Sequence, residues 1–285
     1  MGERGVIFFS RRLLEKGRFV RACVATLTGC LWLGVSPVWA ISSQERFDTV
    51  VIDAGHGGED AGARSHAGLS EKDVVLDVSR RLARRLRAQG LTVALTRTDD
   101  EFVPLEVRTA IANDAGGDLF ISVHANSARN TDARGIETYF VSLEASDELA
   151  ERLASRENQA FDTSATRIPQ RQDPLVALLG DMIATEHVNE SSEFSKLVQG
   201  QLIRRTGEDS RGVKQAPFVV LMGVQMPASL IEIGFLSNLQ DEQNLAAVAH
   251  RNALVEAVAR AVEAFGKRYD ARRGVGRDVS VLRGD

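Results

Sequence analysis

Cysteine is almost absent from this sequence. The 285 residues include two cysteines, Cys23 and Cys30, and both lie within the first 40 residues. If those residues are removed after Ala40, the mature chain has no thiol and can form neither a disulfide nor a cysteine metal site. Any metal ion must then be bound by histidine, aspartate or glutamate side chains.

Signatures of nucleotide and polyanion binding are also lacking. No Gly-Lys-Ser/Thr follows the glycines around residue 56, and no six-residue glycine fingerprint occurs, which argues against a P-loop or a dinucleotide site. Without residues 1–40 the chain carries 29 basic and 37 acidic residues, a net charge of −8. This balance excludes a surface built to coat nucleic acid.

Residues 1–40 have the three parts of an export signal. A basic region between Arg11 and Arg21 precedes an apolar stretch over residues 22–34, and residues 38–40 fit the small-residue cleavage pattern. The apolar stretch is shorter than the ~20 residues that a membrane-spanning helix needs. We therefore expect export to the periplasm or cell envelope, with no transmembrane segment in the mature chain.

The export route is open between two main alternatives. Residues 10–16, which include Arg11 and Arg12, resemble the twin-arginine signal, and a general secretory signal is the alternative. Residues 27–30 also resemble a lipoprotein box that would leave a lipidated Cys30. The apolar run continues past that box to Trp39, which favours the other two routes.

The rest of the chain alternates strand-like and helix-like segments. Its 44% hydrophobic composition can build a core. Apolar runs predict strands and 3.6-residue patterns predict helices. The strands are expected at residues 49–53, 91–96, 119–124, 136–141, 217–221 and 229–233, and the helices at residues 70–90, 105–115 and 241–265.

This alternation predicts one α/β domain over residues 41–265. Its central sheet is mostly parallel or mixed and is flanked by helices on both faces, with a helical insert over about residues 144–211 before the last strands. Residues 266–285 are rich in arginine and glycine and poor in apolar residues, so we expect a disordered tail.

Three polar residues stand where strands or helices are expected to end or begin. His56 follows the first strand, Glu71 lies in the first turn of the first long helix, and His124 ends the third strand. Ligands bind at the carboxyl ends of strands in open α/β sheets. Two imidazoles and one carboxylate form a known catalytic zinc set that leaves one position open.

A candidate general base completes this set. Glu232 is an ionisable residue in an otherwise apolar strand, where a carboxylate is costly unless it is paired or functional. Each residue alone also has a structural explanation: His56 as a turn residue, His124 as a core histidine, and Glu71 as a favourable charge at a helix N-terminus. Their separations of 15 and 53 residues match no local zinc motif, so spacing leaves the choice open.

Six ordered segments resemble the zinc-dependent N-acetylmuramoyl-L-alanine amidases of bacterial cell-wall turnover, the amidase type 3 family. The resemblance extends from about Thr49 to Phe265. The segments are residues 51–63, 71–76, 96–113, 118–126, 135–140 and 227–238.

The resemblance implies one Zn²⁺ ion per chain, with His56, Glu71 and His124 as ligands and Glu232 as the catalytic glutamate. The implied substrate is peptidoglycan. The implied reaction is hydrolysis of the amide between N-acetylmuramic acid and L-alanine of the stem peptide, in cell-wall remodelling or daughter-cell separation. Two rival functions remain: a non-catalytic peptidoglycan-binding module, and a zinc peptidase that cuts within the stem peptide.

The insert over residues 144–211 exceeds what the sheet needs. It is either a helical decoration or a regulatory element. The second possibility rests on resemblance to division-associated members, in which a helix plugs the zinc cleft until a LytM-domain activator displaces it. Residues 175–187 would be that helix. A carboxylate of the insert would then occupy the open zinc position, and Glu157, Asp181 and Glu186 are the candidates.

Overall fold

The computed structural model describes residues 46–159 and 185–275. The predicted export signal with Cys30, the latch candidate Asp181, most of the predicted plugging helix and residues 276–285 lie outside these ranges. Among the described helices, none combines the length and apolarity that crossing a membrane requires.

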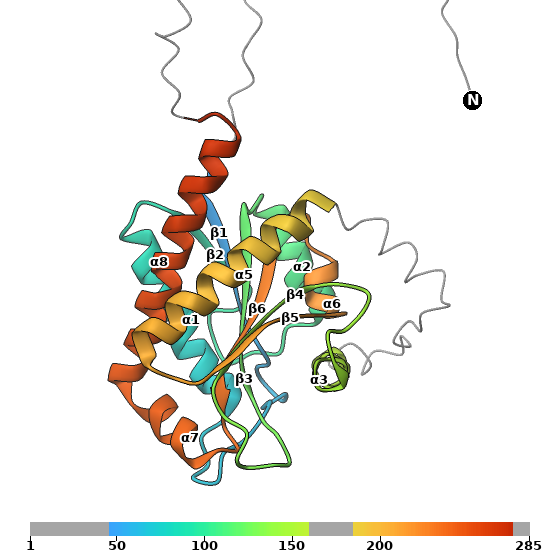
Figure 1. The fold of residues 1–285 in the computed structure, drawn as a ribbon, viewed down its shortest axis with the longest axis vertical. Coiled ribbons are helices and arrows are strands. Elements are labelled where there is room, and N and C mark those ends of the chain that lie inside the picture. Colours follow the sequence, from blue (N-terminus) through green and yellow to red (C-terminus); the bar gives the residue numbers. More distant parts are fainter. Residues whose placement is uncertain (1–45, 160–184, 276–285) are drawn as a thin grey trace, which may run out of the picture. The chain divides into compact units, whose positions relative to one another are not determined.

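Six strands form one sheet in the order β2-β1-β3-β6-β4-β5 (Figure 1), and the predicted mixed sheet is confirmed. The first four of these strands are mutually parallel, β4 is antiparallel to β6, and β5 is parallel to β4. The strands are β1 (Thr49–Ala54), β2 (Thr92–Leu95), β3 (Leu119–Asn126), β4 (Ile136–Val141), β5 (Ser210–Ala216) and β6 (Ala228–Phe235).

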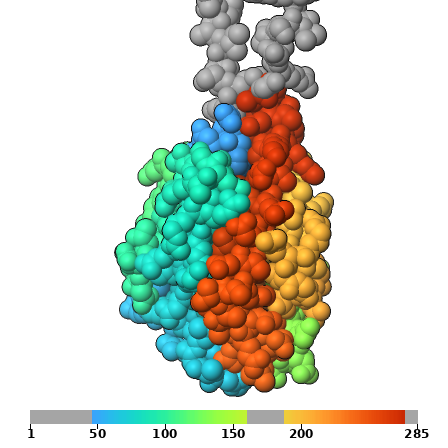
Figure 2. Space-filling model, turned by 90° about the vertical axis from the view of Figure 1, so that its left-hand side faces the viewer, coloured from blue at the N-terminus to red at the C-terminus, as the bar shows by residue number. Residues whose placement is uncertain are grey.

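Helices cover both faces of the sheet. One face packs against α1 (Glu71–Arg87), α5 (Thr185–Thr206) and α8 (Val248–Arg272), and Figure 2 shows α8 between the other two. The opposite face packs against α2 (Leu105–Asp114), α3 (Glu148–Glu157) and α6 (Val219–Met222). The α7 helix (Leu239–Ala246) follows β6.

Alternation along the central strands builds two cores. On β3, Ile121 and Val123 enter the core beneath α1, α5 and α8, whereas Phe120 enters the core on the other face. All eight residues of β3 and of β6 are buried, because both faces of these central strands are covered.

Part of the predicted insert packs on the sheet as a helix. The α5 helix belongs to this insert and contacts β4, β5 and β6, so the described part of the insert includes a helical decoration.

The fifth strand lies earlier than predicted. The strand expected at residues 217–221 is wrong: β5 ends at Ala216, and Val219–Met222 form the short helix α6. Pro217 has no N–H to donate to a ladder, so the strand stops before it. Residues 210–216 were missed because β5 is an edge strand, mostly half-exposed and polar, and lacks the apolar run of a central strand.

The predicted final helix is two helices. Ala247, with an extended ψ of 123°, separates α7 from α8, and the Asn238 side chain accepts hydrogen bonds from the backbone at the start of α7. The α8 helix continues past Phe265 to Arg272, so the start of the expected tail is ordered. Gly266 lies against the Phe47 ring and Tyr269 is buried, which anchors this last part of the helix.

Candidate metal centre and active site

Three adjacent parallel strands bring the candidate residues to one edge of the sheet. His56 lies two residues beyond the end of β1, His124 lies near the end of β3, and Glu232 is the partner of His124 on β6. Glu71 is the first residue of α1 and is buried. The structure therefore assembles all four residues that the sequence singled out.

Glycines let the backbone approach this cluster closely. A Cβ atom on Gly55 would lie 2.4 Å from the His124 ring, and one on Gly62 would lie 2.5 Å from Glu71 Oε2. His56 itself has φ 58°, and it is the only non-glycine residue of the described chain with a positive φ. This left-handed conformation costs energy and persists where surrounding contacts hold it.

Two buried arginines supply those contacts. Arg108 donates to the carbonyl oxygens of Ala54 (2.6 Å) and His56 (2.7 Å), and its Nη1 lies 2.8 Å from Asp53 Oδ1. Arg97 donates to the carbonyl oxygens of Ala54 and Gly55. The loop that carries His56 is thus fixed by its main chain.

Four contacts among the candidate ligand atoms have lengths close to those of a tetrahedral site, and all four atoms lie within 4.8 Å of one another. Glu71 Oε1 lies 3.1 Å from His56 Nε2 and 3.1 Å from His124 Nδ1. Glu157 Oε2 lies 3.3 Å from each of the same nitrogens. A tetrahedron with metal–ligand distances of about 2.0 Å has edges of about 3.3 Å. These four residues can therefore hold a metal ion, and His56 Nε2 has no hydrogen-bond partner among the described residues.

Outer contacts orient the ligands. His56 Nδ1 lies 2.8 Å from Asp60 Oδ2, which fixes the ring and points Nε2 into the cluster. The Glu71 carboxylate accepts from the backbone N–H groups of Ala63 (2.8 Å) and Ala125 (2.9 Å). The sequence analysis missed the contribution of Asp60, although its place four residues after His56 in a glycine-rich loop was a usable signal.

Of the three latch candidates, Glu157 is the one that the structure places in the cluster. It is the last residue of α3, its side chain is buried, and its Oε1 lies 3.1 Å from Arg156 Nε. Glu186 belongs to the first turn of α5, and Asp181 lies outside the described residues. A carboxylate of the insert does reach the histidines.

Charges in the cluster reinforce one another. Burial alone would lower the pKa of His124, but hydrogen bonds and charge interactions with Glu157 and Glu71 raise that pKa to about 10. Burial alone would raise the pKa of Glu71, but His56 and His124 lower it to about 2. Carboxylates and imidazoles are thus held in the charge states that favour close approach.

Glu232 differs from the carboxylates of Glu71 and Glu157. It is fully buried, and neither carboxyl oxygen has a hydrogen-bond partner in the described chain. Burial raises its pKa well above the usual value; Glu71 and Glu157 add to this rise while His124 opposes it. A buried carboxyl group with a raised pKa and no structural partner has the properties of a general acid–base.

Comparison with known proteins decides the family. Residues 50–264 match the Amidase_3 family, described as N-acetylmuramoyl-L-alanine amidase. The chain belongs to the N-acetylmuramoyl-L-alanine amidase family. It is therefore a peptidoglycan hydrolase that cleaves the amide between N-acetylmuramic acid and L-alanine.

Two relatives show how far the likeness extends. N-acetylmuramoyl-L-alanine amidase AmiA of Salmonella typhimurium is 33% identical over 225 residues, which cover 79% of this amidase and 78% of AmiA. AmiC of Neisseria meningitidis is 34% identical over 230 residues, which cover 80% of this chain and 55% of AmiC.

Solved structures agree with this assignment. An N-acetylmuramoyl-L-alanine amidase from Clostridium difficile 630 superposes with a TM-score of 0.60 at 28% identity, covering 78% of this chain and 97% of that one. AmiC2 of Nostoc punctiforme superposes with a TM-score of 0.57 at 30% identity, covering 78% and 98%. The amidase fold thus spans nearly all of the described residues.

Proposed function

We propose that this amidase is a zinc enzyme in which His56, Glu71 and His124 are the ligands and Glu232 is the catalytic acid–base. The observation that carries the proposal is the mutual spacing of the ligand atoms, 3.1 Å between Glu71 Oε1 and each imidazole nitrogen. Two histidines and one carboxylate are a known catalytic zinc set.

The reaction divides between the metal and the chain. When bound, zinc lowers the pKa of a water molecule to about 7 and polarises a carbonyl group. Glu232 takes the proton of the attacking water and later gives it to the leaving amine of L-alanine. Because Glu232 lies beside His124 on the neighbouring strand, strands about 4.8 Å apart place the proton carrier next to the reacting atoms.

Product analysis tests this function. Zinc-loaded residues 41–285 are incubated with purified sacculi, with and without a chelator, and the soluble products are identified by mass spectrometry. Stem peptides that begin at L-alanine, lost with the chelator and in Glu232→Gln, are expected. Products that keep L-alanine on the sugar would indicate a peptidase. A chain that binds sacculi but releases nothing, even with the Glu157→Gln substitution, would indicate a binding module.

We also propose that Glu157 is an autoinhibitory latch. A catalytic zinc site keeps one position open for water, whereas here Glu157 Oε2 lies 3.3 Å from both imidazole nitrogens, where it can act as a fourth ligand. A carboxylate there competes with water and leaves Glu232 without a reactant. The intact chain is then expected to have weak basal activity.

Neutralising the latch tests it. Glu157→Gln should hydrolyse labelled sacculi at least tenfold faster than the unmodified chain, because an amide is a poorer zinc ligand than a carboxylate. Glu151→Gln, an equal change at an exposed position of the same helix, is the matched control and should leave the rate unchanged. Equal or lower activity of Glu157→Gln would refute the latch and would indicate a fourth structural ligand.

The proposed latch suggests how the expected activator would act. A LytM-domain protein that moves α3 would withdraw Glu157 from the histidines and open the site to water. We propose that this takes place in the cell envelope after export, by the twin-arginine or the general secretory route, since peptidoglycan lies outside the cytoplasmic membrane. A role in daughter-cell separation fits this regulation.

A further inference from the structure

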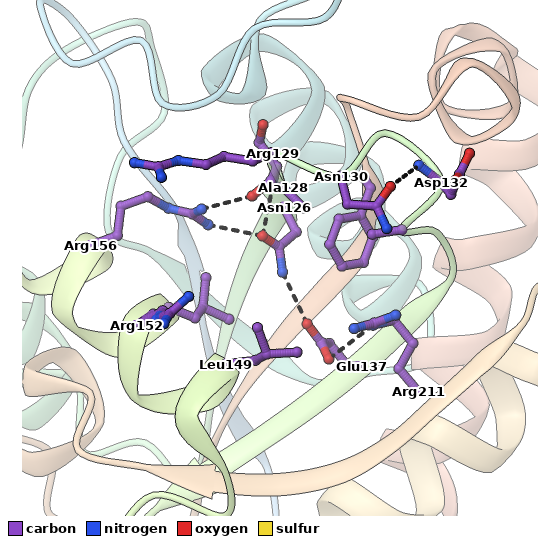
Figure 3. Close-up of a pocket in the computed structure, with 14 residues that line it drawn as sticks. Asn126, Ala128, Arg129, Asn130, Asp132, Glu137, Leu149, Arg152, Arg156 and Arg211 are labelled. Carbon is purple, nitrogen blue, oxygen red and sulfur yellow. Dashed lines mark hydrogen bonds and ion pairs between the residues drawn. The ribbon is translucent and has the colours of Figure 1, made fainter.

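A cavity of about 880 Å³ lies beside the candidate metal centre and is lined by arginines. Its walls come from the β3–β4 connection, from α3 and from the start of β5 (Figure 3). Four guanidinium groups and two carboxylates line it. They belong to Arg129, Arg152, Arg156, Arg211, Asp132 and Glu137.

Two of these arginines are held in place. Arg156 donates to the Ser127 carbonyl oxygen (2.8 Å) and to Asn126 Oδ1 (2.9 Å). Arg211 Nε lies 3.2 Å from Glu137 Oε2, and its guanidinium lies 4.8 Å from the centre of the Phe235 ring. These contacts fix both guanidinium groups as positively charged parts of the cavity wall.

The other two arginines have little to neutralise them. Arg129 is exposed and forms no hydrogen bond or ion pair in the part of the chain that the structure describes. Arg152 pairs with Glu148, but the two side chains are 69% and 75% exposed, so this pair contributes little. Four arginines against two carboxylates leave an excess of positive charge in the walls, which favours an anionic ligand.

The cavity lies within reach of the scissile bond. Asn126, which lines it, is two residues beyond His124 on β3, a separation of about 7 Å at ~3.3 Å per strand residue. A peptide extended from the metal centre covers the same distance in about two residues. The stem peptide carries free carboxylates beyond L-alanine, so the distance matches its first acidic groups.

A neighbouring cavity, which includes part of the cluster, has a more acidic lining. This cavity of about 600 Å³ is lined by His56 and Glu71 together with Glu59, Asp60 and Phe102. Carboxylates in this wall repel an anionic peptide, whereas a neutral sugar is accepted. Arg156 and Ser127 line both cavities, so the two spaces adjoin.

We propose that the arginine-lined cavity is a carboxylate subsite that binds the stem peptide on the leaving-amine side of the cut. The inference rests on the proposed function, since it assumes that the amide is cut at the His56–Glu71–His124 cluster. It sets the direction of the substrate: peptide toward Arg129 and Arg211, and sugar toward Phe102. Charge recognition there selects acidic stem peptides over amidated ones.

Binding of the free product tests the subsite without requiring turnover. The tripeptide L-Ala-D-Glu-L-Lys is titrated calorimetrically into the mature chain, because the cavity is present with Glu157 in its observed position. Three further tripeptides are amidated at D-Glu, at the C-terminus, or at both. Loss of one charge-assisted contact is expected to weaken binding about tenfold, and the singly amidated peptides identify which carboxylate binds.

Variants assign that preference to the cavity. The double variant Arg129→Ala/Arg152→Ala should lose most of the preference for the free over the doubly amidated tripeptide, because it removes two of the four arginines that line the cavity. Arg260→Ala, an equal loss of charge at an exposed position of α8, should keep the full preference. The proposal is overturned if the unmodified chain binds no tripeptide, if it binds the free and doubly amidated forms equally, or if the double variant keeps the full preference. Sacculus cleavage would stand in each of these cases, so the two failures are distinguishable.

Discussion

Replacing Asp53 by asparagine should destabilise the domain and loosen the metal site together. Asp53 is 1% exposed, and its carboxylate accepts hydrogen bonds from Thr96 Oγ1 (2.7 Å), Ser122 Oγ (2.7 Å) and Arg108 Nη1 (2.8 Å). Asparagine keeps the shape but removes the charge, and its amide group presents a donor to groups that already donate. Arg108, itself 2% exposed, would then be a buried cation without its counter-ion.

The expected loss is about 3–5 kcal/mol, the cost of breaking a buried ion pair by removing one partner. For a domain of this size it corresponds to a fall in Tm of roughly 6–20 °C. Arg108 also donates to the His56 carbonyl oxygen, so a displaced guanidinium frees the loop that carries a proposed ligand. Zinc affinity should then fall about 10- to 100-fold, as when an outer contact of a metal site is removed.

Urea unfolding of the mature chain, followed by circular dichroism, measures the first effect, and competition with a chromophoric chelator measures the second. Asp99→Asn is the matched control, because Asp99 pairs with Arg80 while their side chains are 79% and 43% exposed. That change should cost less than about 1 kcal/mol. If Asp53→Asn and Asp99→Asn lower stability equally, or if zinc affinity is unchanged in Asp53→Asn, the reasoning is wrong.

Three further predictions follow from the same contacts. Gly55→Ala should abolish sacculus hydrolysis, since its Cβ would lie 2.4 Å from the His124 ring. Gly90→Ala is the control: its Cβ would meet no atom within 4 Å, so this change should lower stability but keep activity. Burial raises the pKa of Asp53, but Arg108, Thr96 and Ser122 lower it by more, so the net pKa lies below the ordinary value of 3.8. The stabilisation by this carboxylate is therefore present above the pKa of the unfolded chain and is lost as the pH falls through the pKa of the folded chain. In acid titrations, the difference in stability between the unmodified chain and Asp53→Asn should close below about pH 4. Chelation of the metal should lower the Tm in differential scanning calorimetry, because an ion that binds only the folded state stabilises it. A Tm that does not depend on zinc would contradict the proposed ligand set.

The central part of the fold could be predicted from the sequence because burial leaves a strong pattern. All of β3 is buried, and its apolar run predicted both its place and the position of His124 at its end. The edge strand β5 could not be found in this way, because its side chains are half-exposed and polar. The break at Ala247 was missed because Leu245 and Val248 fit one helical apolar pattern in the sequence, whereas in the structure Leu245 is buried and Val248 is 49% exposed.

The identity of the candidate site residues could be predicted from the sequence, but their arrangement in space could not. Separations of 15 and 53 residues between His56, Glu71 and His124 carry no local motif, so the resemblance to a family supplied what spacing could not. Choosing Glu157 among the candidates of the insert required the end of α3 to be placed against the histidines. A single carboxylate at a helix end has no sequence pattern that distinguishes it from its neighbours.

Topology explains why the metal centre and the arginine-lined cavity share one edge of the sheet. Because β1, β3 and β6 are parallel, their carboxyl ends meet there and place His56, His124 and Glu232 together. The β4 strand is antiparallel to β6, so its first residues, including Glu137, lie at the same edge, and β5 begins there with Arg211. The β3–β4 connection contributes Arg129 to that edge. An all-parallel sheet would place the starts of these strands at the far edge, so the one antiparallel pairing allows a proton carrier and a charged peptide subsite to lie on neighbouring strands.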